Sequence, residues 1–372
     1  MHKNKCRIIS YVLILSALLS GCAVSTVEET TDTTPVLSSS TTVTTVTEKT
    51  SVTETTETTA VQTTEEIKPL EFDPHVYSCF LEACYGDDYR ESFFNLIDAL
   101  QEGRDSFECK SKEIYDFLMD DVVQNQLYPF ACMQIEKKSK KDKNSYKDGI
   151  GYIRYTESKE DFLSRYEDFK KDIMAILDAY IKPDYTDFEK CLALYDYMVC
   201  NYEYDYDDSL NRSGGSCLAF LKYKKGICAD FSALYSYLLL QCGVDAIAVS
   251  NWGEDDTTGY HSWTFVDIDG KGYHIDTTWG IKEDKTVPTF KLDYFMMTDE
   301  DRALDGYPKE ELDIYILPFF YARDIKDYDF SANDSSYRLP RYSECSRYDT
   351  KSNTIYYYNY LIDSDEHQFK YE

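Results

Sequence analysis

Two strand-forming runs around an Asp-Gly turn at 269–270 constrain the fold more than any other feature of this sequence. The runs span residues 261–268 and 271–278, and Asp-Gly is a dipeptide that two-residue hairpin turns favour. In such a hairpin the position opposite His261 lies two residues beyond Asp276, on the same face of the sheet. Diagonal neighbours of this kind lie about 7–8 Å apart. We therefore expect the imidazole of His261 and the carboxylate of Asp276 to form a hydrogen bond.

A helix is predicted to begin at Cys228, directly after Gly226-Ile227, and to end before Gly243. Its apolar residues recur at helical spacing: Phe231, Leu234, Tyr235, Leu238 and Leu239. A thiol in the first turn lies among unpaired backbone N–H groups and at the positive end of the helix dipole. Both effects stabilise the thiolate form. The sequence therefore predicts a reactive Cys228.

His261 and Asp276 supply the base and the orienting carboxylate that a thiol nucleophile needs. Taken alone, Cys228 would more readily be a core cysteine at a helix start. The presence of His261 and Asp276 reverses this preference and favours a site. His274 shares the sheet face of Asp276 and competes for the role of base, although the His-Ser-Trp setting favours His261. A metal site formed by Cys228, His261 and His274 lacks supporting ligand spacing. We expect no metal and no cofactor.

Three motifs in this order resemble the transglutaminase-like superfamily, in its bacterial secreted branch. They are Gly226-Ile-Cys228 at the start of a helix, His261-Ser-Trp263, and Tyr273-His-Ile-Asp276-Thr-Thr-Trp279. The resemblance covers about Asp187 to Asp299. It implies an α+β fold with a papain-like core, the Cys at a helix N-terminus and the His and Asp on antiparallel strands. It also implies that Cys228 is the nucleophile, His261 the general base and acid, and Asp276 the residue that holds the imidazole.

Two features do not follow directly from the family pattern. The residues after Cys228 differ from it, and the side-chain donor to the oxyanion is not identified. The helix reads Cys-Ala-Asp-Phe-Ser, where many relatives have a small residue and Tyr after the Cys. The backbone N–H of Cys228 is the expected first donor to an oxyanion. Tyr202, Tyr204 and Tyr206 are the candidates for a side-chain donor.

These residues predict a cysteine-dependent enzyme that acts on amide bonds of a protein or peptide substrate, with cell-wall-associated material as one candidate. Thiolate attack on the carbonyl gives a thioester. Water then yields proteolysis or deamidation, and a lysine amine yields an isopeptide crosslink. We favour hydrolysis, because a transferase must exclude water and no lid is identifiable. The alternative is a non-catalytic module that binds peptide or cell-wall material, although such a module needs no nucleophile.

The N-terminus predicts export. Three basic residues, Lys3, Lys5 and Arg7, precede an apolar stretch at 8–19, which is shorter than the roughly 20 residues of a membrane-spanning helix. The stretch ends in Leu19-Ser-Gly-Cys22, which resembles the bacterial lipobox, where the Cys is lipidated. We expect residues 1–22 to be a lipoprotein signal peptide. The chain would then be anchored through Cys22 on the extracellular face of the cell membrane, or secreted if the lipobox is not used.

Residues 23–68 predict a disordered tether, because they are dominated by Thr, Ser, Val and Glu and contain no aromatic residue. The net charge of the chain is −29, which argues against nucleic acid as a partner and against membrane contact other than through the lipid anchor. The basic cluster at 137–143 is expected to be a solvated loop between two strands.

The folded part is expected to contain three regions: an extension at 69–185, the core at 186–300 and a small β-rich appendage at 301–372. In the extension we predict helices at 89–100 and 111–123, strands at 129–135 and 149–155, and a long helix capped by Ser158. A capping box of Thr186 and Glu189 opens the core. The appendage is expected to hold strands at 354–362 and 368–371 and to pack onto the core.

The cysteines of the folded part do not form a regular disulfide pattern. Cys191 and Cys200 lie on opposite faces of one predicted helix. Cys228 and Cys242 would be about 21 Å apart at the two ends of another, too far for a bond. Cys217 is the alternative partner that would switch Cys228 off. Most of the other cysteines are expected to be small buried hydrophobic residues.

Overall fold

The computed structural model describes residues 69–136, 145–207, 217–252, 259–307, 313–314 and 331–372. All of these belong to one compact unit, Thr64–Glu372. The predicted signal peptide, the tether and the basic cluster at 137–143 lie outside the described residues. Among the described residues, no helix has both the length and the apolar character needed to cross a membrane.

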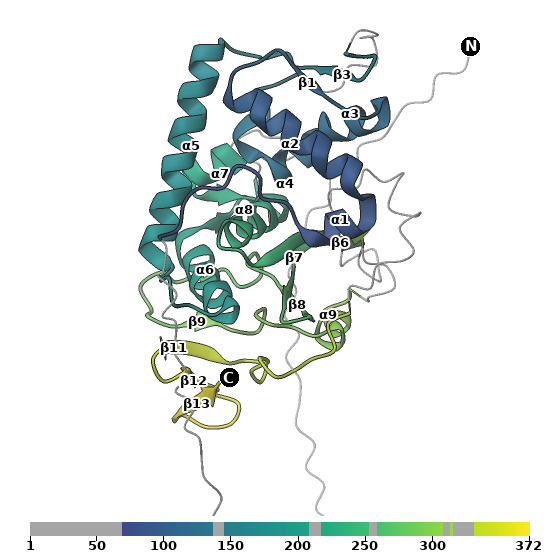
Figure 1. Ribbon diagram of the computed structural model, residues 1–372. Coiled ribbons are helices and arrows are strands. Elements are labelled where there is room, and N and C mark those ends of the chain that lie inside the picture. Colours follow the sequence, from purple (N-terminus) through teal and green to yellow (C-terminus); the bar gives the residue numbers. More distant parts are fainter. Residues whose placement is uncertain (1–68, 137–144, 208–216, 253–258, 308–312, 315–330) are drawn as a thin grey trace, which may run out of the picture. The chain divides into compact units, whose positions relative to one another are not determined.

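Helix α8 (Cys228–Gln241) lies at the centre of the fold and packs against an antiparallel sheet (Figure 1). The sheet has the strand order β10-β6-β7-β8. Its strands are β6 (Asp245–Trp252), β7 (Tyr260–Ile268), β8 (Lys271–Ile275) and β10 (Asp313–Ile314). Helices α4 and α6 cover other sides of α8, so nearly every side chain of α8 is buried, including all five of its predicted apolar positions.

The β7–β8 hairpin has the predicted register. Ile268 pairs with Lys271 across the two-residue turn, as expected. Strand β8 nevertheless ends at Ile275, three residues before the predicted end. The reason is Asp276, whose Oδ1 accepts the backbone N–H groups of Thr278 and Trp279 at 3.0 and 3.1 Å. A side chain that caps its own backbone in this way turns the chain out of the sheet.

Before its long helix, the described part of the N-terminal extension contains four α-helices and a small antiparallel sheet of order β1-β3-β2. The elements are α1 (Cys79–Tyr85), α2 (Asp87–Gln101), β1 (Ser106–Glu108), α3 (Lys112–Leu118), α4 (Asp121–Leu127), β2 (Tyr146–Lys147) and β3 (Ile150–Tyr152). Helix α2 confirms the prediction for 89–100. The helix predicted at 111–123 is two helices, because Asp120 caps the N-terminus of α4 with a hydrogen bond to the Val122 N–H.

The strand predicted at 129–135 is wrong. Pro129 instead begins a 3₁₀ turn, Pro129–Ala131, in which Phe130 is buried against aromatic residues of α5. Proline lacks the N–H that a strand ladder requires and suits the first position of a helical turn. Only Ile135 keeps a strand-like bridge, to Tyr155.

Two capped helices lead from the extension into the core. Helix α5 (Lys159–Tyr180) begins after Ser158, whose hydroxyl accepts the Asp161 N–H. Helix α6 (Asp187–Asn201) begins with the predicted capping box of Thr186 and Glu189. The chain then forms β4 (Glu203–Tyr204), α7 (Cys217–Tyr223) and β5 (Lys225–Gly226), and β4 pairs with β5 in parallel. This pairing places Tyr204 beside the entrance to α8.

The C-terminal region packs onto the core, as expected for the appendage. Strand β9 (Phe290–Lys291) joins β11 (Glu344–Asp349), β12 (Thr354–Tyr358) and β13 (Glu366–Lys370) in one antiparallel sheet. The Tyr371 hydroxyl donates to Glu189 at 2.8 Å, and its ring packs against Phe188. The region therefore closes on the first turn of α6 rather than forming a separate module.

All ten cysteines of the described residues are free thiols. The expectation that Cys228 and Cys242 do not pair is confirmed, and Cys217 is not bonded to Cys228 either. Five of the other nine are fully or nearly fully buried at 3% exposure or less, which fits their predicted role as small core residues.

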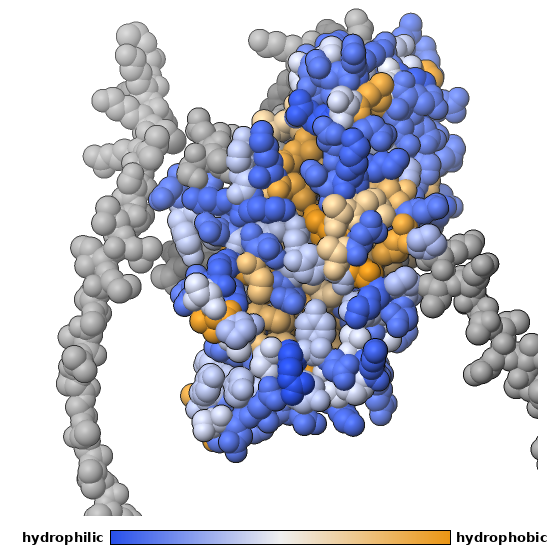
Figure 2. All heavy atoms as spheres, turned by 90° about the vertical axis from the view of Figure 1, so that its left-hand side faces the viewer, coloured by the Kyte–Doolittle hydropathy of each residue, from blue (hydrophilic) through white to orange (hydrophobic). Residues whose placement is uncertain are grey.

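Hydrophilic residues cover most of the face seen in Figure 2, with hydrophobic residues gathered in patches between them.

Candidate active site

Cys228 is the first residue of α8, and its partly buried side chain lies at the N-terminus of the helix. Asp230 fixes this start, because its buried Oδ2 accepts the Ile227 N–H at 3.0 Å. Gly226 is required just before it: a Cβ there would lie 2.6 Å from Asp230 Oδ2 and from the ring of Phe220. The predicted Gly-Ile-Cys entry to the helix thus has a steric reason.

His261 and Asp276 lie together as the hairpin register predicts. His261 Nε2 and Asp276 Oδ2 are 2.7 Å apart, and both side chains are buried. The His261 side chain also forms a hydrogen bond with the Cys228 thiol, which leaves Nδ1 as the ring atom that faces the sulfur. The Trp279 ring stacks on the imidazole, with 4.9 Å between the ring centres and 16° between the ring planes, and so restricts the orientation of the imidazole. The structure therefore brings all three predicted residues into one relay.

The charges of the three groups support one another. Burial raises the pKa of the Cys228 thiol, but the hydrogen bond and charge of His261 outweigh it, and the pKa is lowered overall. Burial lowers the pKa of His261, but Asp276 outweighs it and raises the pKa to about 9. The pKa of Asp276 is lowered despite complete burial, because His261 and then Arg302 stabilise the carboxylate. The resting state favoured by these shifts is a thiolate–imidazolium pair.

Ser262 is a functional neighbour of Cys228 that the sequence did not predict. Its backbone and its side chain both form hydrogen bonds with the Cys228 sulfur and lower the thiol pKa. The Ser262 hydroxyl lies 3.0 Å from that of Ser232, one turn along α8 from Cys228. The available signal was the polar Ser232, four residues after Cys228 on the same helix.

Of the three tyrosines considered as oxyanion donors, Tyr204 is next to Cys228. Its hydroxyl forms a hydrogen bond with the backbone of Cys228, and burial raises the pKa of Tyr204 to about 12. Tyr202 is fully buried and bonded to the Tyr197 hydroxyl at 2.9 Å and to Lys224 at 2.8 Å. Tyr206 is 85% exposed at the edge of the site. Tyr204 is therefore the best-placed side chain to meet charge that develops near the Cys228 N–H.

His274, the competing base, uses both ring nitrogens away from Cys228. Its Nδ1 accepts the Trp263 N–H at 3.0 Å, and its Nε2 lies 3.1 Å from Asp299 Oδ1. Because a base must have a ring nitrogen free to reach the thiol proton, the geometry favours His261. Cys228, His261 and His274 do not converge on one point, as a metal site would require.

Arg302 is the second residue that the sequence did not predict. It comes from α9 (Asp299–Leu304), is 1% exposed, and donates from Nη1 to Asp276 Oδ2 at 3.3 Å. An arginine in the acidic segment Asp-Glu-Asp-Arg is typical of a solvated helix, so composition alone points away from its burial.

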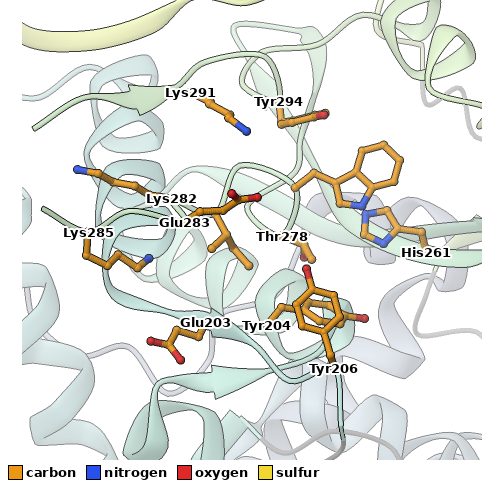
Figure 3. Close-up of a pocket in the computed structure, with 12 residues that line it drawn as sticks. Glu203, Tyr204, Tyr206, His261, Thr278, Lys282, Glu283, Lys285, Lys291 and Tyr294 are labelled. Atoms are coloured by element: carbon orange, nitrogen blue, oxygen red, sulfur yellow. The ribbon is translucent and has the colours of Figure 1, made fainter. Parts of the chain in front are cut away.

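A cleft of about 720 Å³ leads to His261 (Figure 3). Its residues come from β7, from β4 and β9 with the residues just after them, and from the loop after Asp276: Glu203, Tyr204, Tyr206, His261, Thr278, Trp279, Ile281, Lys282, Glu283, Lys285, Lys291 and Tyr294. Figure 3 shows His261 at one end and the lysines Lys282 and Lys285 at the other. Lys285 is fixed there by hydrogen bonds from Nζ to the carbonyls of Val199 and Tyr202. The volume lies within the usual range of ligand-binding clefts.

Comparison with known proteins gives a match for the central part of the chain. Residues 175–277 match the transglutaminase-like superfamily, a segment that contains Cys228, His261 and Asp276. No curated protein matches the chain. Among solved structures, a candidate cysteine protease from Cytophaga hutchinsonii is 17% identical with a TM-score of 0.28, and a TGase is 21% identical with a TM-score of 0.27.

These structural likenesses are partial. The first covers 38% of this chain and 41% of the other, and the second covers 35% of each. The chain therefore spans less than half the length of either protein. The sequence match over residues 175–277 confirms the resemblance to the transglutaminase-like superfamily that the three motifs predicted.

Proposed function

We propose that this protein is a cysteine-dependent enzyme that cleaves or exchanges amide bonds in a protein or peptide substrate. One observation carries the proposal: Cys228, His261 and Asp276 form a continuous hydrogen-bonded relay at the end of a cleft. A module that only binds peptide or cell-wall material needs no thiol of lowered pKa. The lowered pKa of Cys228 and the raised pKa of His261 therefore favour the enzyme over the binding module.

The reaction follows from the positions of the three groups. The Cys228 sulfur attacks the carbonyl carbon, and the carbonyl oxygen takes up the negative charge near the Cys228 N–H and Tyr204. The imidazolium of His261 gives its proton to the leaving nitrogen, the C–N bond breaks, and an acyl thioester remains. His261, now neutral, takes a proton from water or from an amine, which attacks the thioester and releases Cys228. Asp276 stabilises the imidazolium at each stage.

Hydrolysis is the favoured outcome of the second step. Tyr206 lines the cleft and is 85% exposed, so water reaches the wall of the site next to Tyr204, with which Tyr206 packs. An acyl transferase must protect its thioester from water until an amine arrives. Among the described residues no element covers this side of the cleft.

The test uses the full chain with a glutamine-containing dipeptide and with a mixture of unrelated peptides. Ammonia release and conversion of glutamine to glutamate identify deamidation, new peptide termini identify proteolysis, and a hydroxamate formed with added hydroxylamine traps the thioester. Cys228→Ala is expected to abolish every product. Cys217→Ala, which removes a buried thiol from the neighbouring helix α7, is the matched control and is expected to retain them. Products that persist in Cys228→Ala contradict the proposal, and binding without any product supports the non-catalytic module.

We further propose that the enzyme works on the extracellular face of the cell membrane, held there by a lipid on Cys22. The motif Leu-Ser-Gly-Cys22 after a short apolar stretch supports this placement. Mass spectrometry of the mature N-terminus is expected to find an acylated Cys22. The variant Cys22→Ser is expected either to appear in the medium instead of the membrane fraction or to keep its signal peptide uncleaved. An unmodified mature N-terminus elsewhere in the chain would contradict this placement.

A further inference from the structure

Arg302 shares one carboxylate oxygen with the proposed base. Its Nη1 donates to Asp276 Oδ2 at 3.3 Å, and His261 Nε2 lies 2.7 Å from the same oxygen. All three side chains are buried, with exposed fractions of 1%, 0% and 6% for Arg302, Asp276 and His261. Two cations that meet one buried anion compete for its charge, because the low local dielectric strengthens every one of these interactions.

Aromatic rings hold the guanidinium in this position. Its Cζ lies 4.1 Å from the centre of the Trp263 ring and 5.1 Å from those of Trp279 and Tyr307, which is within cation–π range. The same three rings also pack against His261. Within the described part of the chain, Arg302 Nε and Nη2 have no hydrogen-bond partner. The guanidinium therefore acts on its surroundings mainly through its positive charge, and to a smaller extent through hydrogen bonds.

Asp276 does not need Arg302 for its orientation. Its Oδ1 is already fixed by the N–H groups of Thr278 and Trp279, and the rest of its hydrogen bonding is through Oδ2. The second carboxylate near Arg302 is Asp305, whose Oδ2 lies 3.8 Å from Nη1, beyond hydrogen-bond distance, while its Oδ1 pairs with Arg341 at 2.6 Å. Asp276 is therefore the principal counter-charge of Arg302.

We propose that Arg302 is a positioning residue that acts through Asp276: by sharing Oδ2, it limits how tightly the Asp276–His261 pair holds its proton. The consequence rests on the proposed function. His261 must give this proton to the leaving nitrogen and regain one from water, and a base that holds its proton too firmly fails at the first of these steps. Arg302 lies outside the segment that matches the superfamily, which ends at residue 277.

The test is an NMR titration of the His261 ring proton in the full chain, which requires no turnover and so is independent of whether the proposed function holds. The sequence has five histidines, and the missing signal of His261→Gln assigns the resonance. Arg302→Met keeps the length of the side chain and removes its charge. We expect this variant to raise the His261 pKa by about 1, which is a tenfold gain in proton affinity. Arg302→Lys, which retains a charge, is expected to stay close to the wild type.

Arg338→Met is the matched control. The side chain of Arg338 is only 9% exposed. It pairs through two nitrogens with Asp301 of α9, the helix that also carries Arg302, at 2.9 and 3.0 Å. Its loss is expected to lower the unfolding temperature and to leave the His261 titration unchanged. If Arg302 contributes packing alone, Arg302→Met is expected to behave like Arg338→Met, with a lower unfolding temperature and an unchanged His261 titration. An unchanged or lowered His261 pKa in Arg302→Met overturns the proposal.

A second measurement keeps the proposal testable if Arg302→Met does not fold. In the wild-type chain labelled with ¹⁵N-arginine, the guanidinium signal of Arg302 is followed through the titration of His261. Loss of the imidazolium charge leaves the carboxylate to Arg302 alone, so its signal is expected to move with the same midpoint. An Arg302 signal that stays constant through this titration overturns the proposal.

Discussion

His261→Ala is expected to lower the rate of amide turnover by about 10²–10⁴-fold, the usual contribution of a general acid–base. The same variant is expected to slow alkylation of Cys228 by iodoacetamide at neutral pH. In the wild type, His261 stays protonated up to a pKa of about 9 and holds the thiol pKa below its ordinary value. Without the imidazolium, burial acts on the thiol with less opposition and raises its pKa. The alkylation rate, measured as a function of pH, should therefore rise at a higher pH in the variant.

Two further histidine variants make this result specific. His367→Ala removes a histidine that pairs with Asp363 on the C-terminal sheet, far along the chain from the cleft, and is expected to leave the profile unchanged. His274→Gln tests the competing base. We expect the alkylation rate of Cys228 in this variant to rise at the same pH as in the wild type. If His274→Gln moves that rise and His261→Ala does not, the assignment of the base is wrong.

Asp276→Ala is expected to destabilise the fold by about 3–5 kcal/mol, because removal of one partner from a buried charge cluster leaves the other charges uncompensated. Here two cations, His261 and Arg302, lose their common anion, and the turn after Ile275 loses its cap. Urea unfolding at neutral pH measures the difference. The folded pKa of Asp276 is lowered, so its contribution is complete above the unfolded value of about 3.9 and is lost as the pH falls below it.

Glu283→Ala is the control for this measurement, since Glu283 lines the same cleft with an exposed side chain. Its loss is expected to change the free energy of unfolding by less than about 0.5 kcal/mol. A loss of stability in Asp276→Ala no larger than this would mean that water replaces the carboxylate, and that the cluster is not the buried unit described above.

Local signals in the sequence are sufficient for the parts of the site that lie close together along the chain. The Asp-Gly turn determines the register of the hairpin and hence the neighbours of His261. Apolar spacing and the Gly-Ile-Cys entry locate α8 and its first residue. Thr186 and Glu189 form the capping box that the spacing of the two residues predicts. In each case the signal and the contact it describes lie within about one supersecondary unit.

The failures concern contacts that depend on the whole fold. The run after Pro129 is apolar and short, and such a run does not distinguish a strand from a buried turn; packing against α5 decides for the turn. Arg302 lies in an acidic helix and is buried only because Trp263, Trp279 and Tyr307 surround it. No periodicity in the sequence around Arg302 reports on rings that come from other segments.

The position of Arg302 in the chain also bears on how far this catalytic centre is modular. A fragment or chimera that ends with the superfamily segment at residue 277 keeps Cys228, His261 and Asp276. It loses Arg302, the Asp299 partner of His274, and the strands that close on α6. A chimera that exchanges only this segment would thus carry Cys228, His261 and Asp276 without the Arg302 guanidinium that pairs with Asp276. If the proposed function holds, we expect a fragment to need α9 and the C-terminal sheet as well as the segment at 175–277 that sequence comparison detects.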